Sequence, residues 1–252
     1  MTVLSGRNAL VTGGGHGLGR SIAVALDAAG ARVIVCGRDR GQLEETVGLL
    51  RSGRSAICDV ADPASVDALA AELAGEEISI LVNNAGIAGP TAPLTQVEPA
   101  QWDEVMAVNV RGTYLMCRAF LPSMVARGAG DIVNIASVSG KRPLIDRTPY
   151  CASKMAVIGL TTTLALEVGP SGVRVNSLSP GYVRGPRMTG NLERNAARTG
   201  RSVEAVEREF VERTALHRML EEDEVGAAVV AMLQLPGMTG ADVDLSAGMV
   251  AR

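Results

Sequence analysis

Short apolar runs alternate along the chain with longer segments in which apolar residues recur every three or four positions. The runs are rich in Val and Ile and have the length of buried strands, as in Asn8–Thr12 (NALVT) and Arg32–Cys36 (RVIVC). The longer segments, such as Leu18–Ala29 and Tyr150–Val168, have the period of helices. Further strands are predicted at Ser55–Cys58, Ile78–Val82, Asp131–Ala136, Val173–Leu178 and Asp242–Leu245, and further helices at Arg40–Arg51, Ala64–Ala74, Glu98–Arg127 (one long helix or two) and Glu221–Leu233.

This alternation predicts an α/β fold. Strands separated by helices form a parallel sheet covered on both faces, and right-handed crossovers make that sheet doubly wound. No Pro/Ser-rich linker, repeat or low-complexity tract divides the sequence, so residues 1–252 are interpreted as one domain. The polar, helix-prone segment 186–220 is expected to form a helical lid over a substrate site.

Composition narrows the core and the partners. Of the 252 residues, 47% are hydrophobic but only 2% are aromatic, so the core must be built from Ala, Val, Leu and Ile. The formal net charge of −3 argues against nucleic acid as a partner, because phosphate binding usually requires a clustered basic surface. We find no signal peptide and no apolar run of membrane-spanning length.

The cysteines and histidines suggest neither disulfides nor a metal site. Cys36 and Cys58 lie in apolar runs, Cys117 and Cys151 are isolated, and no CxxC pair occurs. Buried free thiols fit a reducing cytoplasm, which is the expected location. The two histidines are far apart in sequence and lack ligand spacing, so no metal is predicted.

A glycine-rich turn follows the first strand. Thr12–Gly19 reads TGGGHGLG, and the helix that begins near Leu18 directs its free N–H groups at this turn. Glycines let a pyrophosphate approach the backbone closely. The spacing is Gly13-x-x-x-Gly17-x-Gly19 rather than GxGxxG, and a purely structural turn is the alternative.

Five motifs in order identify a family. TGGGHGLG, the Asn83–Gly86 run (NNAG), Ser137, the Tyr150-x-x-x-Lys154 pair and Pro180-Gly181 together resemble the short-chain dehydrogenase/reductase family. The resemblance covers essentially the whole chain. It implies one Rossmann-type domain with about seven parallel strands, and an oxidoreductase that moves a hydride between a nicotinamide cofactor and a carbonyl or secondary alcohol.

The resemblance also assigns the cofactor face. Asp59 would meet the adenine amino group, and the backbone N–H of Val60 an adenine nitrogen. Asn83, Ala85 and Gly86 would support the adenosine side and the centre of the sheet; for Asn83, the alternative is a purely structural role in bonding strand backbone. The remaining cofactor residues implied are Gly13, Gly15, His16, Gly17, Leu18, Gly19, Tyr150, Lys154, Pro180, Gly181 and Val183.

Cofactor choice depends on the end of the second strand. Gly37 stands where relatives that use NAD usually have Asp, and Arg38 follows it. A guanidinium can pair with the 2′-phosphate of NADP, so the sequence favours NADP(H). NAD(H) is the alternative, because a small shift could bring Asp39 to the ribose hydroxyl.

The candidate chemistry centres on Tyr150. Tyr150 and Lys154 share one helix face, and the lysine charge favours the phenolate over the phenol. Ser137 can hold the substrate oxygen, and the thirteen-residue spacing to Tyr150 favours it over Ser139. The resemblance assigns Asn109 to a water-mediated proton relay from Lys154 and Lys154 to the nicotinamide ribose.

Substrate and assembly are less determined. The substrate pocket is expected at Ile87–Gln96, Val138–Pro149 and Tyr182–Arg218, where basic residues suggest an anionic substrate, with solvated surface charges as the alternative. Those residues are Lys141, Arg142, Arg147, Arg184 and Arg187. A 3-oxoacyl reductase and a sugar or alcohol dehydrogenase both fit. A non-catalytic dinucleotide-binding sensor or scaffold is the alternative from another class. The resemblance further implies a homotetramer. The family usually has Thr where this chain has Gly185, so a contact to the nicotinamide carboxamide or the cofactor phosphates is expected to be missing.

Overall fold

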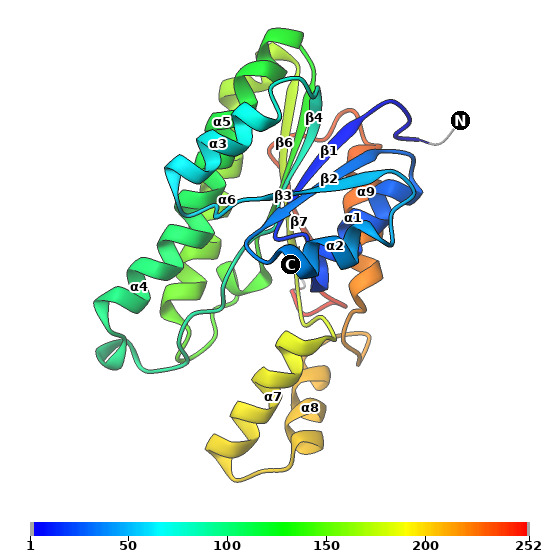
Figure 1. The fold of residues 1–252 in the computed structure, drawn as a ribbon. Coiled ribbons are helices and arrows are strands. Elements are labelled where there is room, and N and C mark those ends of the chain that lie inside the picture. Colours follow the sequence, from blue (N-terminus) through cyan, green and yellow to red (C-terminus); the bar gives the residue numbers. More distant parts are fainter. Residues whose placement is uncertain (1–2, 251–252) are drawn as a thin grey trace.

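Seven parallel strands form one sheet in the order β3-β2-β1-β4-β5-β6-β7 (Figure 1). The computed structural model describes residues 3–250. The chain runs outward from β1 to β3 and then resumes on the other side of β1 at β4, as in doubly wound sheets, so right-handed crossovers in the two directions place helices on opposite faces. The strands are β1 (Asn8–Thr12), β2 (Arg32–Gly37), β3 (Gly53–Ile57), β4 (Ile78–Asn83), β5 (Gly130–Ile135), β6 (Val173–Pro180) and β7 (Asp242–Leu245).

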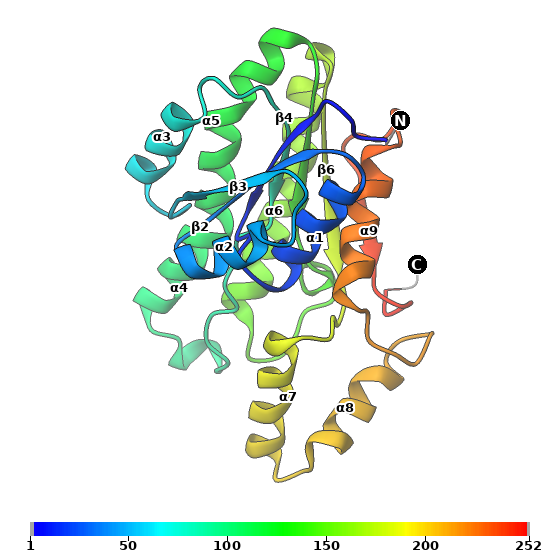
Figure 2. The same cartoon turned by 45° about the vertical axis from the view of Figure 1, so that its right-hand side comes forward.

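Helices cover both faces of the sheet (Figures 1 and 2). Side chains alternate along each strand, so Ala9 and Val11 pack under one helical layer while Leu10 packs under the other. The first layer consists of α1 (Gly17–Ala28), α2 (Arg40–Val47) and α9 (Glu222–Leu233). The second consists of α3 (Pro63–Glu72), α4 (Pro99–Met106), α5 (Gly112–Arg127) and α6 (Thr148–Val168).

The predicted long helix at Glu98–Arg127 is one continuous helical rod with a wider turn in its middle. The π-helical segment η2 (Ala107–Arg111) joins α4 to α5 without a break. The hydroxyl of Thr113 donates to the carbonyl oxygen of Asn109 (2.9 Å), one of the backbone groups of this segment. π-helical turns are frequent at functional sites, and this one carries a predicted catalytic residue.

The predicted helix at Arg40–Arg51 ends early, at Val47. Gly48 follows, and the N–H groups of Leu49 and Leu50 make short turns back to Thr46 and Val47. Glycine disfavours helix, so the chain leaves the helical path here.

Segment 186–220 forms two helices that project below the carboxyl ends of the strands (Figure 2). α7 (Pro186–Thr199) ends at Gly200, which adopts φ 66°, and Ser202 caps α8 (Val203–Glu212) by accepting from the N–H of Ala205. The pair has an apolar cluster of its own, built from Met188, Leu192, Ala196, Val206 and Met219.

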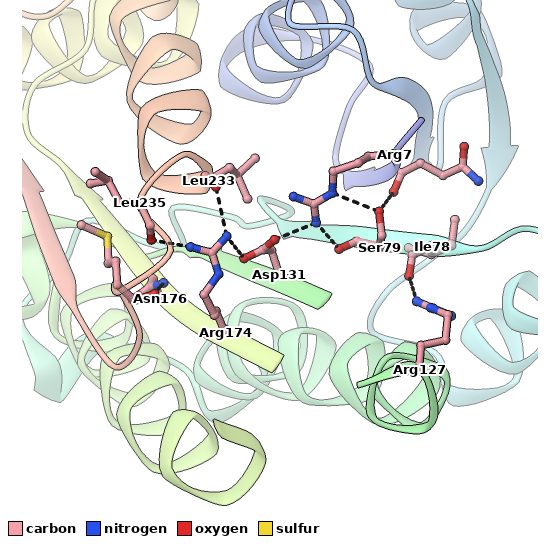
Figure 3. A network of polar contacts seen from close by, with 11 residues as sticks. Arg7, Ile78, Ser79, Arg127, Asp131, Arg174, Asn176, Leu233 and Leu235 are labelled. Atoms are coloured by element: carbon pink, nitrogen blue, oxygen red, sulfur yellow. Dashed lines mark hydrogen bonds and ion pairs between the residues drawn. The ribbon is translucent and has the colours of Figure 1, made fainter. Parts of the chain in front are cut away.

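A buried carboxylate joins several strands at their amino ends, on the side of the sheet away from segment 186–220 (Figure 3). Asp131, at the start of β5, lies between Arg7 and Arg174, each with a nitrogen 2.6 Å from one of its oxygens. Arg7 also donates to the carbonyl oxygen of Ser79 (2.8 Å), and Arg174 to that of Leu233 (3.0 Å). The amino ends of β1, β4, β5 and β6 are thereby joined through charges far from the carboxyl edge.

The structure bears on two expectations from the sequence, one about the cysteines and one about membrane-spanning segments. All four cysteines are free, and Cys36, Cys58 and Cys117 are buried. The prediction that no apolar stretch reaches membrane-spanning length is wrong on length and mean hydropathy alone, since the helical stretch Thr148–Ser171 meets both. This is weak evidence for a membrane span, because α6 lies along the sheet beside β6 and core helices of globular proteins meet the same criteria.

Candidate active site

A cleft of about 2030 Å³ opens at the carboxyl ends of the strands, between the sheet and the two helices of segment 186–220. Doubly wound sheets bind ligands at this edge. All but two of the predicted site residues line the cleft, the exceptions being Asn83 and Asn109. Those that line it are Gly13, Gly15, His16, Gly17, Leu18, Gly19, Arg38, Asp59, Val60, Ala85, Gly86, Ser137, Tyr150, Lys154, Pro180, Gly181 and Val183.

The turn after β1 requires glycine. Gly13 and Gly17 have φ of 62° and 53°, which side chains disfavour. A Cβ on Gly19 would collide with the carbonyl of Gly13 and the side-chain amide of Asn84. The backbone of this turn is therefore open to a ligand, which fits a bound pyrophosphate.

Neighbouring side chains fix the turn in place. The carbonyl oxygen of Gly15 accepts from Arg20 Nη2 (2.6 Å) and from Thr46 Oγ1 (3.1 Å). His16 precedes α1 with extended backbone and makes no side-chain cap. The first N–H groups of α1 thus face the cleft uncapped by His16, and a helix start of this kind binds phosphate.

At the end of β2, the structure gives the neighbouring residues Arg38 and Asp39 different surroundings. The side chain of Asp39 accepts from the N–H of Gln42 (3.1 Å) and caps α2. Arg38 and Arg40 are exposed, line the cleft, and have no carboxylate partner among residues 3–250. A Cβ on Gly37 would meet only Leu43, at 3.6 Å, so the space beside it is open to a ligand.

The side chain of Asn83 does not line the cleft and bonds to buried neighbours instead, and its support of the cofactor side stays a prediction. As the last residue of β4 it is 4% exposed, and its Nδ2 donates to Asn134 Oδ1 (2.8 Å) and Cys117 Sγ (3.3 Å). These contacts agree better with the alternative of a structural role for Asn83, but its partners are side chains and not strand backbone. Asn84, which was not predicted, lines the cleft instead.

Asn84 and Thr12 couple the glycine turn to β4. The Nδ2 of Asn84 donates to the carbonyl of Thr12 (2.9 Å), while the hydroxyl of Thr12 accepts from the N–H groups of Asn84 (3.0 Å) and Ala85 (2.9 Å). Thr12 belongs to the TGGGHGLG motif and Asn84 to the NNAG motif, and these positions are the sequence signal that could have identified both residues. Asp59, which is expected to meet the adenine, lines the cleft and accepts from the N–H of Ala61 (2.9 Å).

The Tyr150 side chain lies near cationic groups in this cleft. Burial raises its pKa, but Arg187, Lys154, a hydrogen bond with Ser137, and Arg147 lower it, and the net pKa is below the ordinary value. Lys154 Nζ lies 5.9 Å from the centre of the Tyr150 ring. A tyrosine in this setting can release a proton more readily than a free phenol.

Lys154 is held rigidly beside the tyrosine. It is 5% exposed, and its Nζ donates to the carbonyl oxygen of Ile135 (2.7 Å). Burial lowers the pKa of Lys154, Tyr150 raises it and Arg187 lowers it, with a net decrease. Ser137 is also buried, and its Oγ accepts from the N–H of Ser139 (3.1 Å), so Ser139 orients Ser137.

Asn109 is buried behind these residues, not in the cleft. Its Oδ1 accepts from the N–H of Ile87 (2.8 Å), and its Nδ2 donates to Ile87 O (3.0 Å) and Ser153 Oγ (2.9 Å). Asn109 therefore anchors the loop after β4 to α6. A Cβ on Gly86 would lie 3.2 Å from Asn109 Oδ1 and 3.5 Å from Lys154 Nζ, so Gly86 keeps the space between the two polar groups clear.

The segment after β6 passes along the cleft under tight packing. A Cβ on Gly181 would lie 3.0 Å from Ser246 Cα. Val183 forms a parallel bridge with Leu220, which joins the two ends of segment 186–220. A Cβ on Gly185 would lie 2.5 Å from Oε1 of Glu222, so the carboxylate fills the place where a side chain would stand.

The five basic residues predicted near the substrate divide into two groups. Lys141 pairs with Asp242 and Asp244, Arg142 donates to the carbonyl of Met249 (2.6 Å), and Arg184 pairs with Glu207 and Glu221. These three side chains have partners within the protein, as does Arg147, which donates to Thr91 Oγ1 and the carbonyl of Ala88. In the second group, the guanidinium carbons of Arg147 and Arg187 each lie 5.3 Å from the centre of the Tyr150 ring.

Comparison with known proteins places this site in context. The family model described as short chain dehydrogenase matches residues 7–197. Galactitol 2-dehydrogenase from Rhizobium johnstonii is 37% identical over 255 residues, which covers 97% of this chain and 95% of that protein.

Solved structures agree in fold. An actinorhodin polyketide ketoreductase with NADPH has 32% identity, a TM-score of 0.92 and coverage of 99% of both chains. An NAD+-bound xylitol dehydrogenase has 29% identity, a TM-score of 0.92, and coverage of 98% of this chain and 100% of that one.

Proposed function

The chain belongs to the short-chain dehydrogenase/reductase family of nicotinamide-dependent oxidoreductases, and from this we propose that Tyr150 is the acid/base of its hydride-transfer reaction. The carrying observation is the setting of Tyr150, whose pKa is lowered by cations and by Ser137 at the edge of a cleft. A non-catalytic sensor or scaffold would not need a tyrosine activated in this way.

Each polar group has a defined task in the proposed mechanism. When bound, the nicotinamide cofactor supplies or accepts the hydride. In reduction, Tyr150 donates its proton to the carbonyl oxygen, and the hydroxyl of Ser137 holds that oxygen in place. Lys154 stabilises the phenolate left on Tyr150. In oxidation the phenolate removes the alcohol proton.

Asn109 acts as a positioning residue in this proposal. Its three hydrogen bonds to Ile87 and Ser153 tie the loop after β4 to α6, which carries Tyr150 and Lys154. Proton exchange with Lys154 would pass beside Gly86, where the Asn109 side-chain oxygen lies near the ammonium group.

We propose NADP(H) as the preferred cofactor, with NAD(H) as the alternative. Support comes from Arg38 and Arg40, which have no carboxylate partner within residues 3–250, and from Asp39, whose carboxylate caps α2. Two unpaired guanidinium groups attract a 2′-phosphate. The two solved relatives hold NADPH and NAD+ respectively and so support a nicotinamide cofactor without choosing between the two.

The substrate is a small carbonyl compound or alcohol that enters beneath the lid, segment 186–220. The similarity to a polyketide ketoreductase favours a 3-oxoacyl substrate, and the similarity to galactitol and xylitol dehydrogenases favours a polyol. An anionic substrate is supported by Arg147 and Arg187 beside Tyr150.

The test is a spectrophotometric screen of the purified protein. NADPH and NADH consumption is measured with neutral ketones, oxo acids and 3-oxoacyl thioesters, and NADP+ and NAD+ reduction with polyols and secondary alcohols. We expect turnover that Tyr150→Phe abolishes while the cofactor still binds. Tight cofactor binding without turnover of any compound class would instead favour the sensor.

We further propose a reducing cytoplasm as the location, since all four cysteines are free thiols.

We also propose that the protein is a homotetramer. The neighbouring helices α5 and α6 present apolar side chains outward, which a second copy could cover. These are Tyr114, Val125, Met155 and Leu166. Mass measurement in solution tests the assembly, and a monomer would contradict it.

A further inference from the structure

Two arginines beside Tyr150, and a third whose charge acts on one of them, have no carboxylate partner among residues 3–250. Arg147, Arg187 and Arg194 all line the cleft, and the guanidinium carbons of the first two lie 5.3 Å from the centre of the Tyr150 ring. Arg194 donates only to the side chain of Asn191 (2.5 Å). The substrate end of the cleft therefore carries unbalanced positive charge.

Arg147 is the most informative of the three because it is buried. It is 8% exposed, donates to Thr91 Oγ1 (2.9 Å) and the carbonyl of Ala88 (3.0 Å), and leaves its Nε without a hydrogen-bond partner. A buried cation bonded only to neutral acceptors is costly unless an anion comes close. Burial lowers the pKa of Arg147, as do Arg187 and Arg194, while Tyr150 raises it.

Four other arginines that line the cleft, in or next to the lid, have carboxylate partners, and among them Arg198 pairs with Asp146. Arg184 pairs with Glu207 and Glu221, while Arg201 and Arg213 both pair with Glu209. The chain thus supplies carboxylates to four arginines farther out in the cleft and none to those around Tyr150. Such a pattern is typical of a site whose counter-ion arrives with the ligand.

We propose that the substrate is a short oxo acid or hydroxy acid whose carboxylate is bound by Arg187 and Arg147 close to the reacting carbon. This rests on the proposed function, because the reacting oxygen is the one held by Tyr150 and Ser137. Both guanidinium groups lie beside the same tyrosine ring, so the anion must be within a few bonds of the carbonyl. A charge at the far end of a long chain would not reach them.

The chemistry is a reduction of that oxo acid or the reverse oxidation. A 3-oxo carboxylate gains one hydride at the carbonyl carbon and one proton at oxygen, which gives the 3-hydroxy carboxylate and the oxidised cofactor. The carboxylate keeps its charge throughout. Arg187 and Arg147 therefore bind substrate and product alike, and their removal should act mainly on KM.

Arg187 carries the test, because Arg147 also holds the loop around Ala88 and its variants could unfold that loop. Arg187 is exposed in the cleft and has no hydrogen bond or ion pair to a described residue, so Arg187→Leu should leave the fold intact. Arg187→Lys keeps a charge without the guanidinium geometry. Arg208→Leu, on the exposed side of α8 and outside the cleft, is the matched control.

The experiment compares pyruvate, acetoacetate and levulinate with their methyl esters as NADPH-dependent substrates. We expect kcat/KM at least tenfold higher for one of the acids than for its ester, and a loss of at least tenfold in Arg187→Leu through KM for the acid alone. Arg187→Lys should lie between, and Arg208→Leu should match the wild type.

Three kinetic results would overturn the proposal. The first is equal kcat/KM for every acid and its ester. The second is an equal loss for acid and ester in Arg187→Leu with an alkaline shift of the pH profile, which would mean that Arg187 acts only through Tyr150. Reduction of neutral ketones but of no acid would reject the oxo acid while the proposed function stands.

A binding measurement decides the matter without turnover. Calorimetric titration with butanoate in the presence of NADP+ should show binding that weakens at least tenfold in Arg187→Leu and not in Arg208→Leu. Butanoate binding that is absent, or unaffected by Arg187→Leu, counts against the carboxylate site. If butanoate binds as expected but no carbonyl compound is reduced, the proposed function fails and the anion site survives.

Discussion

Gly185 and Glu222 share one space at the edge of the cleft, since a Cβ on Gly185 would lie 2.5 Å from Oε1 of the glutamate. Gly185 also has φ of 148°, a backbone conformation that side chains rarely adopt. Burial raises the pKa of Glu222, and His16 and Arg20 partly offset this. The missing family threonine at position 185 is therefore linked to a carboxylate on the neighbouring helix.

Gly185→Thr is expected to destabilise the fold by about 1–3 kcal/mol, because the new side chain meets Glu222 on a strained backbone. Glu222→Ala in the same chain should recover part of the loss. A double-mutant cycle measured by urea unfolding checks this, with an expected coupling of at least about 0.5 kcal/mol. Strictly additive effects would show that the two positions do not compete for space.

Tyr150→Phe should lower kcat by about 10²–10⁴-fold, because the ring stays and only the proton-transfer group is lost. Cofactor affinity, measured by fluorescence titration, should change little. Tyr114→Phe is the matched control, since Tyr114 is 49% exposed on α5 away from the cleft. Comparable activity of Tyr150→Phe and Tyr114→Phe would remove Tyr150 from the mechanism.

The rate of alcohol oxidation should rise with pH and level off above the pKa of Tyr150, which is lowered from its ordinary value. Only the phenolate accepts the alcohol proton, so the plateau begins below the pH needed by a free phenol. Lys154→Met removes a cation that favours the phenolate, so the midpoint of the kcat/KM profile should move to higher pH. An unmoved midpoint would mean that another group controls the profile.

Arg38→Asp should invert cofactor choice. We expect the wild type to bind NADPH at least tenfold more tightly than NADH, equivalent to about 1.4 kcal/mol, and the variant to prefer NADH. Paired fluorescence titrations measure both affinities. Arg118→Asp, an equal charge change at an exposed position of α5, should leave the ratio unchanged. Tighter NADH binding by the wild type would make Asp39 the ribose-binding residue.

Asp131→Asn should cost about 3 kcal/mol or more of unfolding free energy, because it leaves Arg7 and Arg174 without their shared counter-ion. Urea unfolding measures this, and cofactor affinity should be retained because the site is at the other edge of the sheet. Glu72→Gln, which removes an exposed partner of Arg54, should cost less than about 1 kcal/mol. Equal costs for the two variants would assign no special role to Asp131.

The strands and most helix positions could be predicted because burial imposes a regular period on the sequence. The seven strands and the doubly wound order follow from Val- and Ile-rich runs separated by helices. The π-helical segment at Asn109 could not be predicted in this way. Its buried residue Asn109 bonds through its side chain to Ile87 and Ser153, which are distant in sequence, so no local period signals this arrangement.

The motif alone could not predict which of Asn83 and Asn84 lines the cleft. Both residues stand in the same motif, but Asn83 still belongs to β4 and its side chain follows the strand's alternation into the helical layer. Asn84 has left the strand and reaches back to Thr12. Which asparagine meets the cleft depends on where the strand ends, and that boundary is the least predictable part of a strand.

Basic residues illustrate the same limit for charge. Lys141 looked like Arg147 in the sequence, yet its partners Asp242 and Asp244 come from β7, a hundred residues later. Charge pairing across such a distance is set by the fold alone. The sequence could identify the positive residues near the site but not which of them the protein itself neutralises.

The bridge between Val183 and Leu220 has a consequence for how such a protein can change over time. After Val183 the chain leaves the sheet region to form the lid, and at Leu220 it returns to lie beside Val183. Backbone hydrogen bonds run from Arg184 to Leu220 and from Leu220 to Tyr182. Insertions, deletions or wholesale exchange between these two points would alter what is recognised while the spacing of Ser137, Tyr150 and Lys154 stays fixed. Part of the substrate preference, including the contribution of Arg187, can thus change without altering the residues of the reaction, while Arg147 stays with the fixed part of the chain.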